Sequence, residues 1–198
     1  MLQMLMATRN HAKYLLFAPI FRRYGFEVIT LRDIGKIGDA IEESGATPRE
    51  NALAKARRYH SARYPWVFAD DAGLEIDALD GEPGVEARRW NGRFTDDVDD
   101  ETWLNYLMGR MKGIPLERRT ARFVASWVII APDGSEHIRD IIYPFIIATE
   151  RIRPISPGSP ISAVRLGPED DIGARGRDLQ REWEAWGILP RLLERFSG

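Results

Sequence analysis

The apolar positions of the chain fall into short continuous runs, separated by longer stretches in which they recur every three or four residues. Short runs of this kind predict buried strands, and they lie at 2–7, 26–31, 66–69, 121–131 and 138–148. The longer spacing predicts helices over residues 11–24, 47–63, 101–111 and 179–196. Helical segments between strands predict an α/β protein with helices packed on a sheet.

Composition limits the function classes. The chain has 198 residues, of which 44% are hydrophobic, enough for one core or two small lobes. The net charge of −2 provides no basic field for nucleic acid. The absence of cysteine excludes thiol catalysis and disulfides. No stretch has the length of a membrane span, so we expect a cytoplasmic protein without membrane contact.

Two adjacent carboxylates, Asp70 and Asp71, follow the apolar run 66–69. Gly73 predicts a sharp bend directly after them. We therefore expect a buried strand to deliver both carboxylates to a sheet edge, where ligands of open α/β sheets bind. The alternative is a solvated Asp-Asp turn.

The first strand leads into a helix that Asn10 can cap. Free N–H groups at such a helix start bind anions, and Lys13, one turn into the helix, can reach a phosphate. The alternative is an ordinary cap with a solvated lysine. Pro19 predicts a kink or a late start in this helix.

The helix after residue 47 begins with a capping box, Thr47-Pro-Arg-Glu50. Asn51 and Lys55 are four residues apart and share one helix face. The acidic cluster at 96–101 is a candidate metal site, but acids just before a helix favour its N-terminus, and we expect the structural role.

Three segments resemble the inosine triphosphate pyrophosphatase (Ham1-like) family. Residues 70–92, DDAGLEIDALDGEPGVEARRWNG, resemble its DDSGL…DALxGxPGxxSARYxG block, with Ala72 in place of serine. Thr8-x-Asn10-x-x-Lys13 resembles its phosphate motif, and residues 42–56 resemble EETGxTFxENAxxKA. The Thr-x-Asn-x-x-Lys pattern favours this family over the related Maf-type pyrophosphatases.

The resemblance implies a single Ham1-like domain over 1–198, with a mixed twisted sheet and flanking helices in two lobes around a central groove. It implies hydrolysis of a nucleoside triphosphate, of the non-canonical purine type such as ITP or XTP, to the monophosphate and pyrophosphate with Mg²⁺, in a homodimer. The implied metal ligands are Glu43, Asp70 and Asp71, and the implied catalytic residues are Asp71, Lys13 and Lys55. The implied substrate-binding residues are Thr8, Arg9, Asn10, Lys13, Asn51, Lys55 and Ala72.

The resemblance ends near residue 148, before the family's base-stacking loop and its Ser-His-Arg base reader. Candidate replacements are Arg175 and Arg177 on a glycine-flanked loop, with 157–159 as a wall. Trp183 and Trp186 can stack on a base, although a helical aromatic pair is more often core. The chain is therefore either an active pyrophosphohydrolase with altered base choice or a nucleotide-binding relative with weak or no catalysis.

Overall fold

A computed structural model describes residues 2–38, 44–167 and 172–196 of the chain. Its strands form one sheet in the order β2-β1-β3-β5-β6-β7, with β4 paired to β3. The strands are β1 (Leu2–Met6), β2 (Phe26–Thr30), β3 (Val67–Ile76), β4 (Pro83–Gly84), β5 (Thr120–Ile130), β6 (Glu136–Ile147) and β7 (Arg165–Leu166). The α-helices are α1 (His11–Arg23), α2 (Pro48–Tyr59), α3 (Asp100–Arg110), α4 (Ile172–Trp186) and α5 (Ile188–Phe196). The predicted mixed sheet with flanking helices is confirmed.

The chain divides into two compact units. The first comprises Met1–Asp71, Ala125–Asp140 and Ile172–Gly198, and the second comprises Ala72–Val124 and Ile141–Asp171. Every described residue of the candidate site except Ala72 falls in the first unit.

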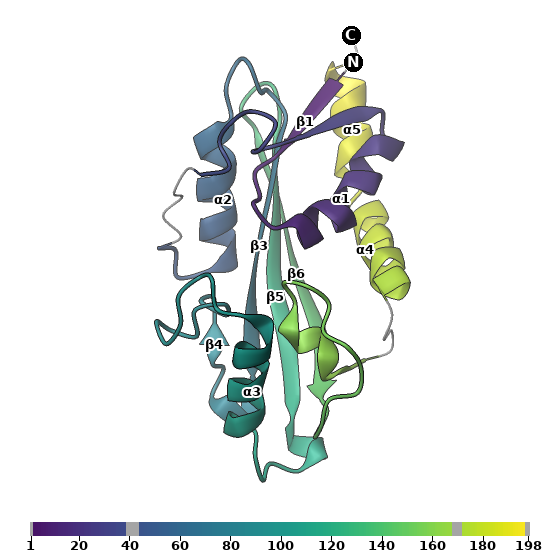
Figure 1. Cartoon of the computed structure of the whole chain (residues 1–198). Helices are drawn as coiled ribbons and strands as arrows, with labels where there is room; N and C mark the ends of the chain where they lie inside the picture. The colour runs from purple at the N-terminus through teal and green to yellow at the C-terminus, as the bar shows by residue number, and fades with distance from the viewer. Residues whose placement is uncertain (1, 39–43, 168–171, 197–198) are drawn as a thin grey trace. The chain divides into compact units, whose positions relative to one another are not determined.

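In the first unit, β1 pairs in parallel with both β2 and β3. Helix α2 covers one face of these strands, and α1, α4 and α5 cover the other (Figure 1). Strand residues alternate between faces, so Val67 and Ala69 pack on the α2 side with Ala52 and Ala56. Phe68 points to the α1 side, where its ring lies 4.9 Å from that of Phe17.

The α1 side of the first unit is an aromatic core. Trp183 of α4 is 1% exposed, and its ring lies 5.2 Å from both Phe21 and Trp127. Trp186 is half-buried, with its ring 5.2 Å from that of Trp183. The expectation that this tryptophan pair belongs to the core is confirmed for Trp183.

The second unit packs α3 and the short strands β4 and β7 around its own apolar core, which includes Leu74, Trp103 and Phe145. Asp99 caps α3 by accepting from the Thr102 N–H at 2.8 Å. The acidic residues before this helix therefore include its N-cap and first turn, as predicted.

Several sequence expectations about local structure are wrong. Strand β3 does not bend at Gly73 but continues to Ile76. A Cβ on Gly73 would lie 2.9 Å from the carbonyl oxygen of Gly84, so this glycine admits a neighbouring strand rather than a turn. The final helix is also not continuous, since Gly187 (φ 58°) separates α4 from α5.

The remaining helix ends follow local chemistry. Asn10 caps α1, and Pro19 lies inside this helix rather than delaying its start. Arg175 and Arg177 lie within α4, not on a loop. Helix α2 ends at Tyr59, before the expected residue 63. Among the described residues, no helix is long and apolar enough to cross a membrane.

Candidate functional site

The site forms where β1 ends beside β3. The N–H groups of Leu5 and Ala7 donate to the carbonyls of Trp66 and Phe68 at 2.9 and 2.8 Å. The next carbonyl along this edge is that of Asp70, which lies past the end of β1, where the chain leaves the sheet for α1. Since β1 lies between β2 and β3, this is the switch point of the parallel strands, the usual ligand site of an open α/β sheet.

Two lysine side chains contact the Asp70 carbonyl beyond the end of β1. Lys13 Nζ, from α1, lies 3.5 Å from the carbonyl oxygen of Asp70, and Lys55 Nζ, from α2, lies 3.4 Å from the same atom. The two helices cover opposite faces of the sheet (Figure 1). The ammonium groups therefore converge from both faces on one backbone oxygen, although 42 positions separate them in the sequence.

The two carboxylates point to opposite faces of β3, as adjacent strand residues must. Asp70 Oδ2 is 2.8 Å from Lys13 Nζ, and Asp71 Oδ1 is 2.7 Å from Lys55 Nζ. Asp70, Asp71 and Lys55 are 4%, 7% and 7% exposed. A buried charge is costly unless it is paired, so each carboxylate needs its lysine or a replacement cation.

Asn51 links Asp71 to the segment before α2. Its Nδ2 donates to Asp71 Oδ2 at 3.2 Å, and its Oδ1 accepts from the Gly45 N–H at 2.8 Å. A Cβ on Gly45 would lie 2.6 Å from Asn51 Oδ1. Asn51 is 2% exposed, so in this structure both ends of its amide hold Asp71 and the Gly45 backbone in place. The sequence analysis did not assign a role to Gly45, although it lies only two residues before Thr47, where the capping box of α2 begins.

The start of α1 is held by local hydrogen bonds of the Thr8–Lys13 motif. Asn10 Oδ1 accepts from the N–H groups of Ala12 and Lys13 at 2.9 and 3.4 Å, and Thr8 Oγ1 accepts from the Asn10 N–H at 3.2 Å. Thr8 is half-buried, whereas Arg9 and Asn10 are exposed. The motif thus builds the helix start and fixes the first turn that carries Lys13.

One carboxylate oxygen of the site has no partner. Asp70 Oδ1 is buried and forms no hydrogen bond with any described residue. A buried, unpaired carboxylate oxygen fits a hard cation such as Mg²⁺, whose preferred ligands are oxygens. Glu43, the third predicted ligand, lies outside the described residues. Within residues 2–38, 44–167 and 172–196 no three acidic or histidine side chains form a metal cluster.

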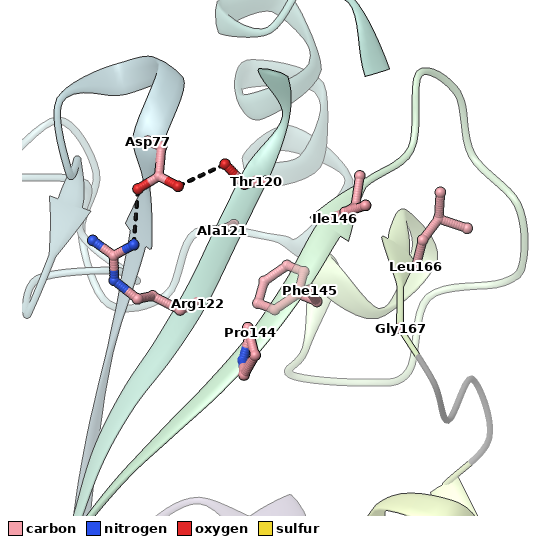
Figure 2. A pocket seen from close by; sticks show the side chains of 9 residues that line it. All are labelled: Asp77, Thr120, Ala121, Arg122, Pro144, Phe145, Ile146, Leu166 and Gly167. Carbon is pink, nitrogen blue, oxygen red and sulfur yellow. Dashed lines mark hydrogen bonds and ion pairs between the residues drawn. The ribbon is translucent and has the colours of Figure 1, made fainter. Parts of the chain in front are cut away.

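A hollow in the second unit carries different chemistry. It has a volume of about 520 Å³ and is lined by Asp77, Thr120, Ala121, Arg122, Pro144, Phe145, Ile146, Leu166 and Gly167. Figure 2 shows its only ionised side chains, Arg122 and Asp77, paired with each other at 2.8 Å. Arg122 also holds Glu75 at 2.7 Å. Its charges are exposed and satisfied, so it is a weaker candidate than the lysine–aspartate site.

The wall expected at 157–159 is a defined turn of the second unit. The Ser159 N–H donates to the Ser156 carbonyl at 2.9 Å, and the Gly158 N–H donates to Asp100 Oδ2 at 2.8 Å. Asp100 also pairs with Arg88 at 2.6 Å. Ala72 is half-buried on β3, directly after Asp71.

Comparisons with known proteins show which family the chain resembles. The Ham1 family matches residues 4–151. The chain is 41% identical to a dITP/XTP pyrophosphatase of Nitratidesulfovibrio vulgaris over 132 residues, which cover 65% of this chain and 63% of that protein. The alignment therefore spans less than two thirds of that relative. A dITP/XTP pyrophosphatase of Nocardia farcinica is 33% identical over 206 residues, covering 97% of this chain and 95% of that protein.

Solved structures show the same fold. A nucleoside-triphosphatase, or dITP/XTP pyrophosphatase, of Mycobacterium abscessus superposes with a TM-score of 0.65 at 29% identity, covering 91% of this chain and 97% of the other. A HAM1 protein of Coxiella burnetii has a TM-score of 0.75 at 22% identity, covering 96% and 100%, a likeness of fold alone. Since the family match covers well over half of the sequence, including the strand and helix starts that carry the lysines and aspartates, the chain belongs to the Ham1 family.

Proposed function

We propose that this protein hydrolyses a nucleoside triphosphate between the α and β phosphates, releasing the monophosphate and pyrophosphate. The carrying observation is the convergence of Lys13 and Lys55 on the Asp70 carbonyl, beside a buried carboxylate oxygen that lacks a partner. The names of the relatives suggest a non-canonical purine nucleotide, such as dITP or XTP, as substrate.

In this proposal the cations of the site hold the triphosphate. Lys13 and Lys55 neutralise phosphate oxygens, and the positive end of the α1 dipole lies at the first turn, which carries Lys13. By family resemblance, Thr8, Arg9, Asn10, Asn51 and Ala72 also contact the substrate, and Asn51 holds Asp71 in position. Transfer of a phosphoryl group needs this kind of charge neutralisation more than covalent chemistry.

The carboxylates supply the remaining chemistry. Asp70 and Asp71, together with Glu43, would hold Mg²⁺, which neutralises developing charge and orients the phosphates. Asp71 accepts the proton of the attacking water as the oxygen bonds to phosphorus and the anhydride bond breaks. By family resemblance we also propose that the protein is cytoplasmic and forms a homodimer. Sedimentation of the purified protein would test the homodimer.

A binding protein with weak or no turnover is the second candidate. Its supporting observation is that the family match ends at residue 151, before the expected base-reading segments. The deciding experiment follows pyrophosphate release from a panel of nucleoside triphosphates with Mg²⁺. Release that is lost in Asp71→Asn supports hydrolysis, whereas binding of the same nucleotides without release supports the second candidate.

A further inference from the structure

The four charged side chains of the site form two ion pairs. Lys13 pairs with Asp70, and Lys55 pairs with Asp71, at 2.8 and 2.7 Å. In the proposed function the same lysines hold phosphates and the same aspartates hold a divalent cation. Each ligand must therefore take one member of a pair that has already formed.

We propose that divalent metal and triphosphate bind this site with positive coupling through an exchange of partners. The lysines leave the aspartates for phosphate oxygens, while the aspartates leave the lysines for the metal. This inference rests on the proposed function, and it concerns how Lys13, Lys55, Asp70 and Asp71 share their charges before and after binding.

Burial makes each half of the exchange unfavourable alone. Metal alone must sit among ammonium groups that contact the same carboxylates, and like charges repel strongly in a poorly hydrated site. Triphosphate alone draws the lysines away from aspartate side chains that are 6% and 10% exposed, leaving buried charges unpaired. Only the joint binding of both ligands gives every charge a new partner.

The two pairs differ in how readily they open. The Lys55 side chain is 8% exposed, and its partner Asp71 is held by Asn51. The Lys13 side chain is 23% exposed, and its partner Asp70 retains an oxygen without a hydrogen bond. We therefore assign the first exchange to Lys13 and Asp70, with Lys13 competing directly with the metal.

The first test measures binding of Mn²⁺ alone, by electron paramagnetic resonance, to wild type and Lys13→Met without nucleotide. Removing a competing cation should tighten Mn²⁺ binding at least about fivefold. Lys112→Met, the same charge change at an exposed position after α3, should bind Mn²⁺ like wild type. Equal or weaker binding by Lys13→Met overturns the exchange.

The main measurement of the second test is made on the wild-type protein, so it does not depend on the folding of a variant. Calorimetry measures the affinity of wild type for inosine triphosphate with a non-hydrolysable α,β-imido bridge, with and without Mn²⁺, after correction for the metal–nucleotide complex in solution. We expect coupling of at least about tenfold, and less in Lys13→Met. Coupling below about threefold in wild type overturns the inference. Coupled binding without pyrophosphate release from any nucleotide would leave the exchange standing and refute the proposed hydrolysis.

Discussion

Each unit of this protein contains a buried cation, and the two cations are held in different ways. In the first unit, Lys55 contacts the carboxylate of Asp71, and the preceding residue Asp70 has a carboxylate oxygen without a hydrogen bond. In the second unit, Arg119 is 3% exposed, and its acceptors among the described residues are neutral. Its Nε reaches the Ile147 carbonyl, and its other nitrogens reach the carbonyls of Ala148, Met111 and Ile114, at 2.8 to 3.3 Å.

The difference separates a functional cation from a structural one. The donors of Arg119 are taken by backbone that cannot leave, so this side chain ties the end of α3 to the end of β6 permanently. Burial lowers the pKa of the Arg119 guanidinium, which still stays charged at neutral pH. The lysines instead contact ionised side chains for which a metal can compete. In this protein the buried cation that also pairs with a carboxylate lies at the proposed site, whereas the buried cation held by carbonyls without a carboxylate forms a cross-link.

The largest expected effect concerns the site. Asp71→Asn keeps the shape of the side chain but removes the charge and the proton acceptor. Pyrophosphate release should fall about 10²- to 10⁴-fold, measured with a coupled phosphate assay on protein whose folding is checked by circular dichroism. Asp96→Asn, in the exposed acidic segment before α3, is the matched control and should keep full activity. Loss of activity in Asp96→Asn would instead implicate that acidic cluster.

The next effect concerns the cross-link. Arg119→Met leaves several buried carbonyls without a donor, and the free energy of unfolding should fall by about 3–5 kcal/mol. Arg119→Lys should not restore it, because an ammonium group cannot span the same carbonyls. Urea denaturation measures both, with the exposed neighbour Arg118→Met as control. A loss of activity per folded molecule in Arg119→Met would contradict its structural role.

Local features of the fold could be predicted from the sequence, whereas the long-range contacts of Arg119 could not. Asn10 as the cap of α1 and Thr47 as the cap of α2 were predicted correctly, because capping depends on residues within one turn. Arg119 carried no signal, since its partners at Ile147 and Ala148 lie almost thirty positions away. Nothing in a single sequence specifies which carbonyls will meet one guanidinium.

Local pattern placed Asp70 and Asp71 at a strand end and Lys13 at a helix start, whereas the roles of the lysine–aspartate site were predicted by resemblance. The meeting of Lys13 and Lys55 depends on β1 ending beside β3, which is a property of the sheet order. Gly73 was misjudged for a similar reason: its role depends on Gly84, which approaches only in the folded sheet. Likewise, Gly45 acquires its importance from contact with Asn51.

The next prediction concerns base selectivity, which depends on whether the protein hydrogen-bonds the base as closely as its lysines would bind the phosphates. Since the family match ends at residue 151, and Arg175 and Arg177 lie in α4, we expect shape and stacking to dominate. Such contacts discriminate weakly compared with buried hydrogen bonds. The preference for inosine over adenosine or guanosine triphosphate in kcat/KM should stay below about a hundredfold, or about 2.7 kcal/mol. A larger preference would reveal a base reader in the C-terminal third.

The smallest expected effect on stability concerns an exposed ion pair on α2, the helix that carries Lys55. Arg49, also on α2, pairs with Asp140 of β6, and their side chains are 54% and 43% exposed. This hydrogen-bonded pair holds the pKa of Asp140 below its ordinary value of 3.8. A lowered folded-state pKa stabilises the protein above the unfolded value, and the contribution is lost as pH falls through the folded one.

Asp140→Asn should therefore lower the free energy of unfolding at pH 7 by less than about 1 kcal/mol, because solvent screens the exposed pair. The difference from wild type should shrink as the pH is lowered from 4 towards the acid range, where the native carboxylate also becomes protonated. Urea denaturation at several pH values, at low and high salt, measures both trends. The prediction would be contradicted if the difference in free energy of unfolding grew in acid. It would also be contradicted if that difference equalled the loss in Arg119→Met, because an exposed pair would then stabilise the fold as much as a buried cation.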